Sequence, residues 1–257
     1  MEVGHDLKSC TKEVQIASTV IDGRDVHLID TPGFDDTELT DSDILVRIAT
    51  YLRKGNIRLS GILYLHPIQT IRVGGAAAKN LKLFQTLVGK DNMRNVKLVT
   101  TMWDKLPREE RGVGEQNVKL LEKDFWDEMM TAGAQVDRCE DPASDGYRII
   151  CSVLTTSPVT LQLQKEMIAG LAVDETTAGK FVMGELNKLR KQHERDIQEL
   201  RELVADASMH RDIVAAIREE CKQKIKRLEE AAEEARKFHE ASLEMLRKEN
   251  ASRCVIL

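Results

Sequence analysis

Apolar and polar positions follow two different patterns along the chain, and the pattern changes near residue 180. Before it, short apolar runs bounded by Gly, Pro and Asp predict strands at 14–21, 26–30, 61–65, 96–101 and 147–151. Helical spacing between these runs predicts helices at 43–53, 76–88, 115–130 and 160–171. Asp22-Gly-Arg-Asp predicts a hairpin turn, and the later alternation of strand and helix favours an α/β fold with a mostly parallel sheet.

The second pattern predicts one long helix over about 181–249, where there is no proline and one glycine, Gly184. Apolar or small residues recur there mostly at steps of three and four: Leu186, Leu189, Ile197, Leu200, Val204, Ile217, Cys221, Ile225, Leu228, Ala232 and Ala235. This stripe favours a self-associating coiled coil with a break near 209–212. The alternatives are a helix folded back on the first half, or two helices packed as a hairpin. We therefore expect an α/β domain at 1–178, a coiled-coil helix at 179–250 and a tail at 251–257.

Composition narrows the classes of function. The chain has 257 residues and a net charge of -5, and no basic run with interleaved aromatic residues, which disfavours nucleic-acid binding. Its five cysteines show no CxxC spacing, so we expect a reducing, cytoplasmic setting without disulfides or zinc. No run of eighteen apolar residues occurs and the N-terminal segment is polar, so neither a membrane span nor a signal peptide is predicted; Glu2 excludes N-myristoylation.

The stretch VHLIDTPGFDD, residues 26–36, is an apolar strand that ends in Asp-x-x-Gly. In P-loop GTPases such a carboxylate holds Mg²⁺ through water, and the glycine amide meets the γ-phosphate where a side chain would block approach. Asp30 and Gly33 fit these roles. The alternative is an ordinary turn at the end of a strand.

A second predicted strand ends in Thr101-Met-Trp-Asp104. A carboxylate such as that of Asp104 can accept both guanine N1–H and the exocyclic amino group, which adenine cannot offer. Met102 stands where guanine-reading loops usually carry lysine, so stacking on the base would come from an apolar side chain.

Four ordered motifs carry a resemblance to a known family: Leu7-Lys-Ser-Cys-Thr11, Ile29-Asp-Thr-Pro-Gly-Phe-Asp-Asp36, Leu63-Tyr-Leu-His66 and Val99-Thr-Thr-Met-Trp-Asp104. Over residues 4–171 the chain resembles the septin/Toc/immunity-associated branch of P-loop GTPases, particularly fungal G-domain proteins. The resemblance implies GTP or GDP and Mg²⁺ as cofactors, Thr11 as the switch I threonine, 30–33 as switch II, and Asp104 with Thr101 at guanine. It also implies self-association of G domains; residues 151–152 are our guess for the last base contact.

The same family pattern requires a first strand and G-x-x-x-x-G-K-[ST], whose amides and lysine surround the phosphates. Only ten residues precede Thr11, and neither Gly89-Lys90 nor Gly179-Lys180 has the upstream glycine. We expect either a sequence that starts too late, which we favour, or a protein with weakened nucleotide binding. Phe34 stands where Ras-like enzymes place the water-orienting glutamine, so hydrolysis must be slow or assisted by a dimer partner. His66 could substitute, but a histidine at a strand end is more often structural.

The chain ends Cys254-Val-Ile-Leu257, a C-a-a-X box with leucine last, which predicts geranylgeranylation of Cys254. The alternative is a helix end with an apolar tail. One lipid anchors only marginally, so dimerisation would be needed for firm attachment to a cytoplasmic membrane face. A straight helix of this length would hold the domain on the order of 100 Å from the bilayer.

These observations favour a guanine-nucleotide-binding switch protein tethered to membranes through a prenylated coiled-coil stalk. The competing hypothesis is a non-enzymatic, membrane-tethered scaffold with a degenerate G domain. A third is a cytoskeletal coiled-coil protein whose C-a-a-X ending is accidental.

Overall fold

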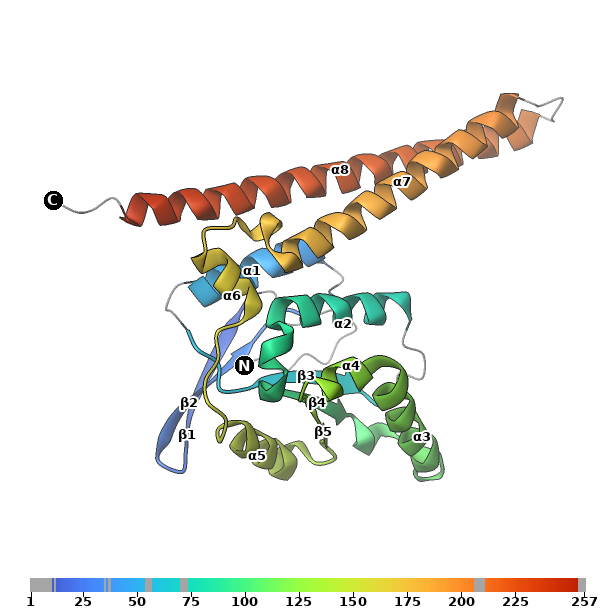
Figure 1. The fold of residues 1–257 in the computed structure, drawn as a ribbon. Coiled ribbons are helices and arrows are strands. Elements are labelled where there is room, and N and C mark those ends of the chain that lie inside the picture. The colour runs from blue at the N-terminus through green and yellow to red at the C-terminus, as the bar shows by residue number, and fades with distance from the viewer. Residues whose placement is uncertain are drawn as a thin grey trace.

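The computed structural model describes residues 11, 13–34, 36, 38–53, 57–69, 74–205 and 211–253. Figure 1 shows a domain of strands and short helices beneath two long helices that lie side by side. The strands are β1 (Gln15–Ile21), β2 (Arg24–Asp30), β3 (Ile62–Pro67), β4 (Val96–Thr101) and β5 (Gln135–Arg138). The helices are α1 (Asp41–Arg53), α2 (Gly75–Val88), α3 (Arg111–Leu121), α4 (Asp127–Thr131), α5 (Pro142–Val153), α6 (Gln162–Ile168), α7 (Thr177–Ala205) and α8 (Arg211–Arg253).

The strands form two separate sheets. β1 and β2 pair antiparallel in one unbroken register, from Gln15 opposite Asp30 to Ile21 opposite Arg24. Their turn places Asp22 and Gly23 at positive φ, 50° and 73°, as a two-residue hairpin turn requires. β3, β4 and β5 pair parallel in that order, which confirms a parallel sheet flanked by helices. Within the described ranges, no strand joins the hairpin to the three-stranded sheet.

The core lies between the parallel sheet and the helices on its face. Fully buried side chains from α1, α2, β4 and α6 meet there: Ile44, Leu45, Leu83, Val88, Leu98 and Leu163. Burial of such side chains is the main favourable term in folding. Phe238 and Met245 of α8 join the same cluster, so the last helix is part of the domain's core rather than an appendage.

Two predictions about secondary structure are wrong. Residues 147–151 belong to α5 and form no strand, because Asp141 caps a helix whose first residue is Pro142. The Asp141 carboxylate accepts hydrogen bonds from the amides of Ala143 and Ser144 at 3.2 and 3.3 Å. The last strand of the sheet is instead the short β5.

The predicted single helix is two helices, α7 and α8, packed as an antiparallel hairpin. Lys224 of α8 forms an ion pair with Asp196 of α7 at 2.6 Å, and both side chains are partly buried. α8 then returns along α1, where Ser42 Oγ donates to Glu234 Oε1 at 2.8 Å. The end of the hairpin away from α1 extends beyond the domain, but the chain turns back there, so the structure shows the fold-back alternatives and not the expected single straight spacer.

A second group of contacts fixes α8 on the turn before α7. His239 Nδ1 lies 2.5 Å from Asp174 Oδ2, and the amide of Asp174 donates to Ser242 Oγ at 3.1 Å. The hydrogen bond and the charge of Asp174 raise the pKa of His239. In the part of the chain that the structure describes, no helix is long and apolar enough to cross a membrane.

We predict that Phe238→Ala lowers the free energy of unfolding by about 3–5 kcal/mol, because it opens a cavity in the core. Urea denaturation followed by circular dichroism measures this. The matched control is Lys237→Ala, which changes an exposed neighbour on the same helix and should stay within about 0.5 kcal/mol of the parent. Equal effects of the two substitutions would show that α8 does not stabilise the domain.

Candidate functional site

Thr11 and Asp30 lie together at the carboxyl end of β2. The Thr11 hydroxyl donates to Asp30 Oδ2 at 3.0 Å, across nineteen residues of sequence, and both residues are half-buried. Hydroxyl and carboxylate oxygens are suitable ligands for Mg²⁺, which commonly binds one or two carboxylates together with phosphate and water. The residues described include no group of three or more His, Cys, Asp or Glu that could hold a metal ion by itself.

The segment after Asp30 exposes Gly33 and uses Phe34 for packing. A Cβ on Gly33 would meet no atom within 4 Å, so the chain itself gives no steric reason for glycine at this position. The Gly33 carbonyl accepts a hydrogen bond from the amide of Asp36 at 3.1 Å, and the Asp36 carboxylate accepts from the amide of Leu39 at 2.9 Å. Phe34 packs against the core cluster.

The loop at the carboxyl end of β4 is organised around Trp103. Its side chain is fully buried, and Nε1 donates to Thr100 Oγ1 at 3.0 Å. Met102 has φ of 61°, an uncommon left-handed conformation for a residue with a side chain. The loop therefore buries Trp103 while Met102 and Asp104 on either side are exposed. Thr101, the last residue of β4, is half-buried, and its carbonyl accepts from the amide of Ile68 at 3.0 Å.

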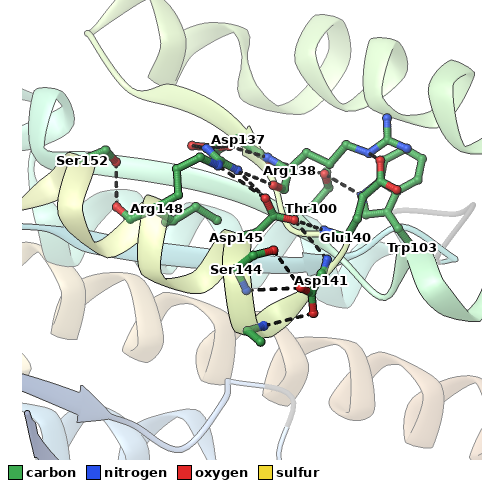
Figure 2. Close-up of polar contacts among 12 residues, drawn as sticks. Thr100, Trp103, Asp137, Arg138, Glu140, Asp141, Ser144, Asp145, Arg148 and Ser152 are labelled. Carbon is green, nitrogen blue, oxygen red and sulfur yellow. Dashed lines mark hydrogen bonds and ion pairs between the residues drawn. The ribbon is translucent and has the colours of Figure 1, made fainter.

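Arg138, at the end of β5, covers the indole of Trp103. Its guanidinium carbon lies 3.4 Å from the ring centroid, within the range of a cation–π contact (Figure 2). Glu140 Oε1 lies 2.8 Å from Arg138 Nε, and Glu115 Oε1 lies 2.5 Å from Nη1. On α3, a Cβ at Gly114 would lie 2.8 Å from Trp103 Cζ3. Neither Arg138 nor Gly114 belongs to a motif, so the sequence gives no signal that would have identified them.

The loop of residues 139–141 lies beside the Trp103 loop, because the amide of Cys139 donates to the Thr100 carbonyl at 2.9 Å. The Asp145 carboxylate accepts from the amides of Glu140 and Asp141 at 2.8 and 3.0 Å, and these bonds lower its pKa. Burial, with the nearby carboxylates of Asp145 and Asp141, raises the pKa of the Cys139 thiol.

Arg148 of α5 ties this helix to β5. Its Nη1 donates to both carboxylate oxygens of Asp137, at 2.9 and 3.0 Å, and Nη2 donates to the Arg138 carbonyl at 2.9 Å (Figure 2). Residues 151–152, our guess for the last base contact, were expected at the end of a strand over 147–151, and that strand is wrong because the segment is helical. Ser152 sits within α5, where its hydroxyl donates to the Ile149 carbonyl of the same helix at 2.6 Å.

The structure brings the expected site residues together in two pairs. Thr11 and Asp30 meet at the hairpin, with Gly33 just beyond, and Thr101 and Asp104 lie at the parallel sheet. Among the contacts of the described residues, none joins one pair to the other. Cys254, the expected lipidation site, lies outside the described residues.

His66 at the end of β3 is buried, and its ring meets that of Trp126 edge-on at a centroid distance of 6.0 Å. Burial lowers the pKa of His66, which favours the neutral imidazole. This packing agrees with a structural role.

Comparison with known proteins identifies a distant relative. No protein-family profile matches the chain. GTP-binding protein A of Dictyostelium discoideum is 32% identical over 99 residues, which are 38% of this chain and only 22% of that protein. Among solved structures, a dimerization-deficient mutant of Toc33 from Arabidopsis thaliana aligns with a TM-score of 0.49 and 18% identity, covering 62% of this chain and 77% of that one. Over the first of these stretches, the chain is therefore related to part of a GTP-binding protein.

We predict that Gly114→Ala destabilises the fold by about 1–3 kcal/mol, because the new methyl group collides with the immobile indole of Trp103. Gly112→Ala is the control, since its Cβ would meet no atom within 4 Å on the same helix, and it should be neutral or stabilise by up to about 1 kcal/mol. Thermal unfolding with tryptophan fluorescence as the probe separates the two. Equal stability of the variants would contradict the packing of α3 on Trp103.

Proposed function

We propose that the chain carries the switch and base-reading parts of a guanine-nucleotide-binding domain. The observation that carries the proposal is the Thr101–Asp104 loop at the carboxyl end of a parallel strand. In this loop Asp104 is exposed, and the buried side chain of Trp103 holds the loop against the core. Ligands of open α/β sheets bind outside the carboxyl ends of their strands. The relationship to a GTP-binding protein over 99 residues supports guanine as the base.

In this proposal each site residue has a separate task. The Asp104 carboxylate accepts the two N–H groups of guanine, and Thr101 lies beside the base. Thr11 and Asp30 provide oxygen atoms for Mg²⁺, and the amide of Gly33 approaches the terminal phosphate. Mg²⁺ would supply neutralisation of charge on the phosphate oxygens.

These 257 residues contain no phosphate-binding loop for the nucleotide, because no G-x-x-x-x-G-K-[ST] occurs in them. The separation of the two sheets supports the same conclusion. Leu65 of β3 is 60% exposed, so the described residues leave this face of the parallel sheet without the covering helix that such sheets normally have. We infer that a further strand, followed by its phosphate loop and a helix, belongs between β2 and β3 in space, and that nucleotide binds weakly without it.

Hydrolysis is not part of the proposed activity of this form. Phe34 packs against the core, and a phenyl ring can neither donate a hydrogen bond to water nor accept a strong one. The competing scaffold function draws support from α7 and α8, which form a long exposed helical surface beside the domain. Loss of nucleotide binding under every condition would favour the scaffold.

We predict that a fluorescent GDP analogue with Mg²⁺ binds this chain weakly, and binds at least about tenfold more tightly when upstream in-frame sequence supplies a phosphate loop. In the extended protein, Asp104→Asn should shift preference from guanine to xanthine nucleotides, because an amide can donate to the xanthine carbonyl. Asp91→Asn, an exposed carboxylate elsewhere, is the control and should leave the preference unchanged. Unaltered base preference in Asp104→Asn would refute the role of this loop.

We also propose that Cys254 carries a geranylgeranyl group and that the protein sits on a cytoplasmic membrane face. Because α8 returns along α1, the described part of the chain ends on the domain side of the helical hairpin and not at its tip. Cys254→Ser should move the protein from the membrane pellet to the supernatant in cell fractionation, with Cys221→Ser as the control. An unchanged distribution would favour a C-a-a-X ending without function.

A further inference from the structure

β1 forms an edge of the hairpin sheet, and among the described residues none of the usual protection of an edge strand is found. Its sequence, QIASTVI, contains no charged residue, proline or glycine over seven positions. The register with β2 runs through all seven pairs without a bulge. Natural proteins guard edge strands with lysine, proline, bulges or a covering element, because unpaired backbone groups recruit other strands. Within the described residues, β1 pairs with β2 alone.

The exposed side chains of β1 are apolar where an edge strand is normally polar. Val20 is 65% exposed and Ile16 54% exposed, and both lie on the same face of the hairpin with exposed Ser18 between them. The opposite face of the hairpin is the buried one, because Ile21 and Val26 lie on that face and are buried. The hairpin therefore presents both an open edge and two apolar side chains beside it.

The sequence of β1 is self-complementary about Ser18. An antiparallel partner strand related by a two-fold axis at Ser18 would place Ile16 of one copy opposite Val20 of the other, and Ala17 opposite Thr19. The two exposed apolar residues, Ile16 and Val20, then meet each other on both sides of the axis, which stabilises strand pairs, while Gln15 meets Ile21. No charge on β1 opposes the pairing, and none offers complementarity to a charged peptide. These features favour a second copy of this chain as the occupant.

We propose that two copies associate through β1, which joins two hairpins into one four-stranded antiparallel sheet. The interface is isologous, as two-fold symmetry requires. Because only a seven-residue strand of each copy takes part, we expect the interface to bury less than about 1,200 Å² in total, as in weak complexes, and the dimer to form at micromolar or higher concentrations. This inference does not depend on nucleotide binding, because every residue it uses lies outside the proposed nucleotide site.

A charge introduced at Ser18, on the two-fold axis, tests the register directly. Sedimentation equilibrium of the parent chain without nucleotide should show a monomer–dimer equilibrium. Ser18→Lys and Ser18→Glu should each weaken it at least about tenfold, since like charges then stand directly opposite one another. An equimolar mixture of the two should restore association. Leu120→Lys, at another exposed apolar position, is the control and should leave the equilibrium unchanged.

Three results would overturn the proposal: a monomeric parent at all concentrations, unchanged dimers of Ser18→Lys, or a mixture that fails to associate. Circular dichroism of each variant checks that the fold persists. If a charged variant fails to fold, Ser18→Cys supplies the second measurement. A short bifunctional thiol reagent should link Ser18→Cys dimers more efficiently than Val20→Cys dimers, whose thiols would lie about four residues, or about 13 Å, apart along the paired strands. Equal yields from the two would contradict the two-fold axis at Ser18.

Discussion

Burial of Trp103 is the constraint on which the conformation of the loop after β4 depends. The indole occupies the corner between β4, α3 and the end of β5, and it leaves no water-accessible surface. To reach that corner, the chain adopts a left-handed conformation at Met102, which costs of order 1 kcal/mol or more for a residue with a side chain. Strain of this kind persists only where the surrounding contacts determine it. Here Gly114, Thr100 and Arg138 do so from three elements, and the result is a fixed, outward-facing Asp104.

The packing of α8 changes what the C-terminal half can do. A helix of 43 residues spans about 65 Å, and a free one would serve as a spacer. Instead Ala231, Phe238 and Met245 recur every seven residues and are buried, while the flanking positions remain exposed or partly exposed. Their burial competes directly with self-association, because a face used against the domain is not available to another coil. Any dimer of this chain must therefore use a surface other than that face.

The sequence predicted local structure well where one turn or one strand decided the outcome. Asp22-Gly23 specified the first hairpin, and the apolar run at 96–101 matches β4 in both bounds. The prediction from sequence failed where a helix N-cap outweighed the strand preference of the residues that follow it. The apolar stretch within 147–151 favours a strand by composition, yet Asp141 caps a helix that begins five residues earlier, at Pro142, and continues through this stretch. β5 was missed because four residues with no clear alternation give no periodic signal.

The sequence proposes candidate site residues through motifs, but it does not predict how they are arranged in space. Asp30 and Asp104 are candidates because each comes at the end of an apolar strand, whereas Arg138 acts through a contact between β5 and the β4 loop that no spacing encodes. The two halves of the site belong to separate sheets, and parallel strands hold their loops together only through hydrogen bonds between neighbours. A ligand that spans both halves must therefore either bridge them itself or bind after another strand has joined them. If the ligand bridges the two sheets itself, the cost of ordering them reduces its affinity. If another strand has already joined them, that cost is absent.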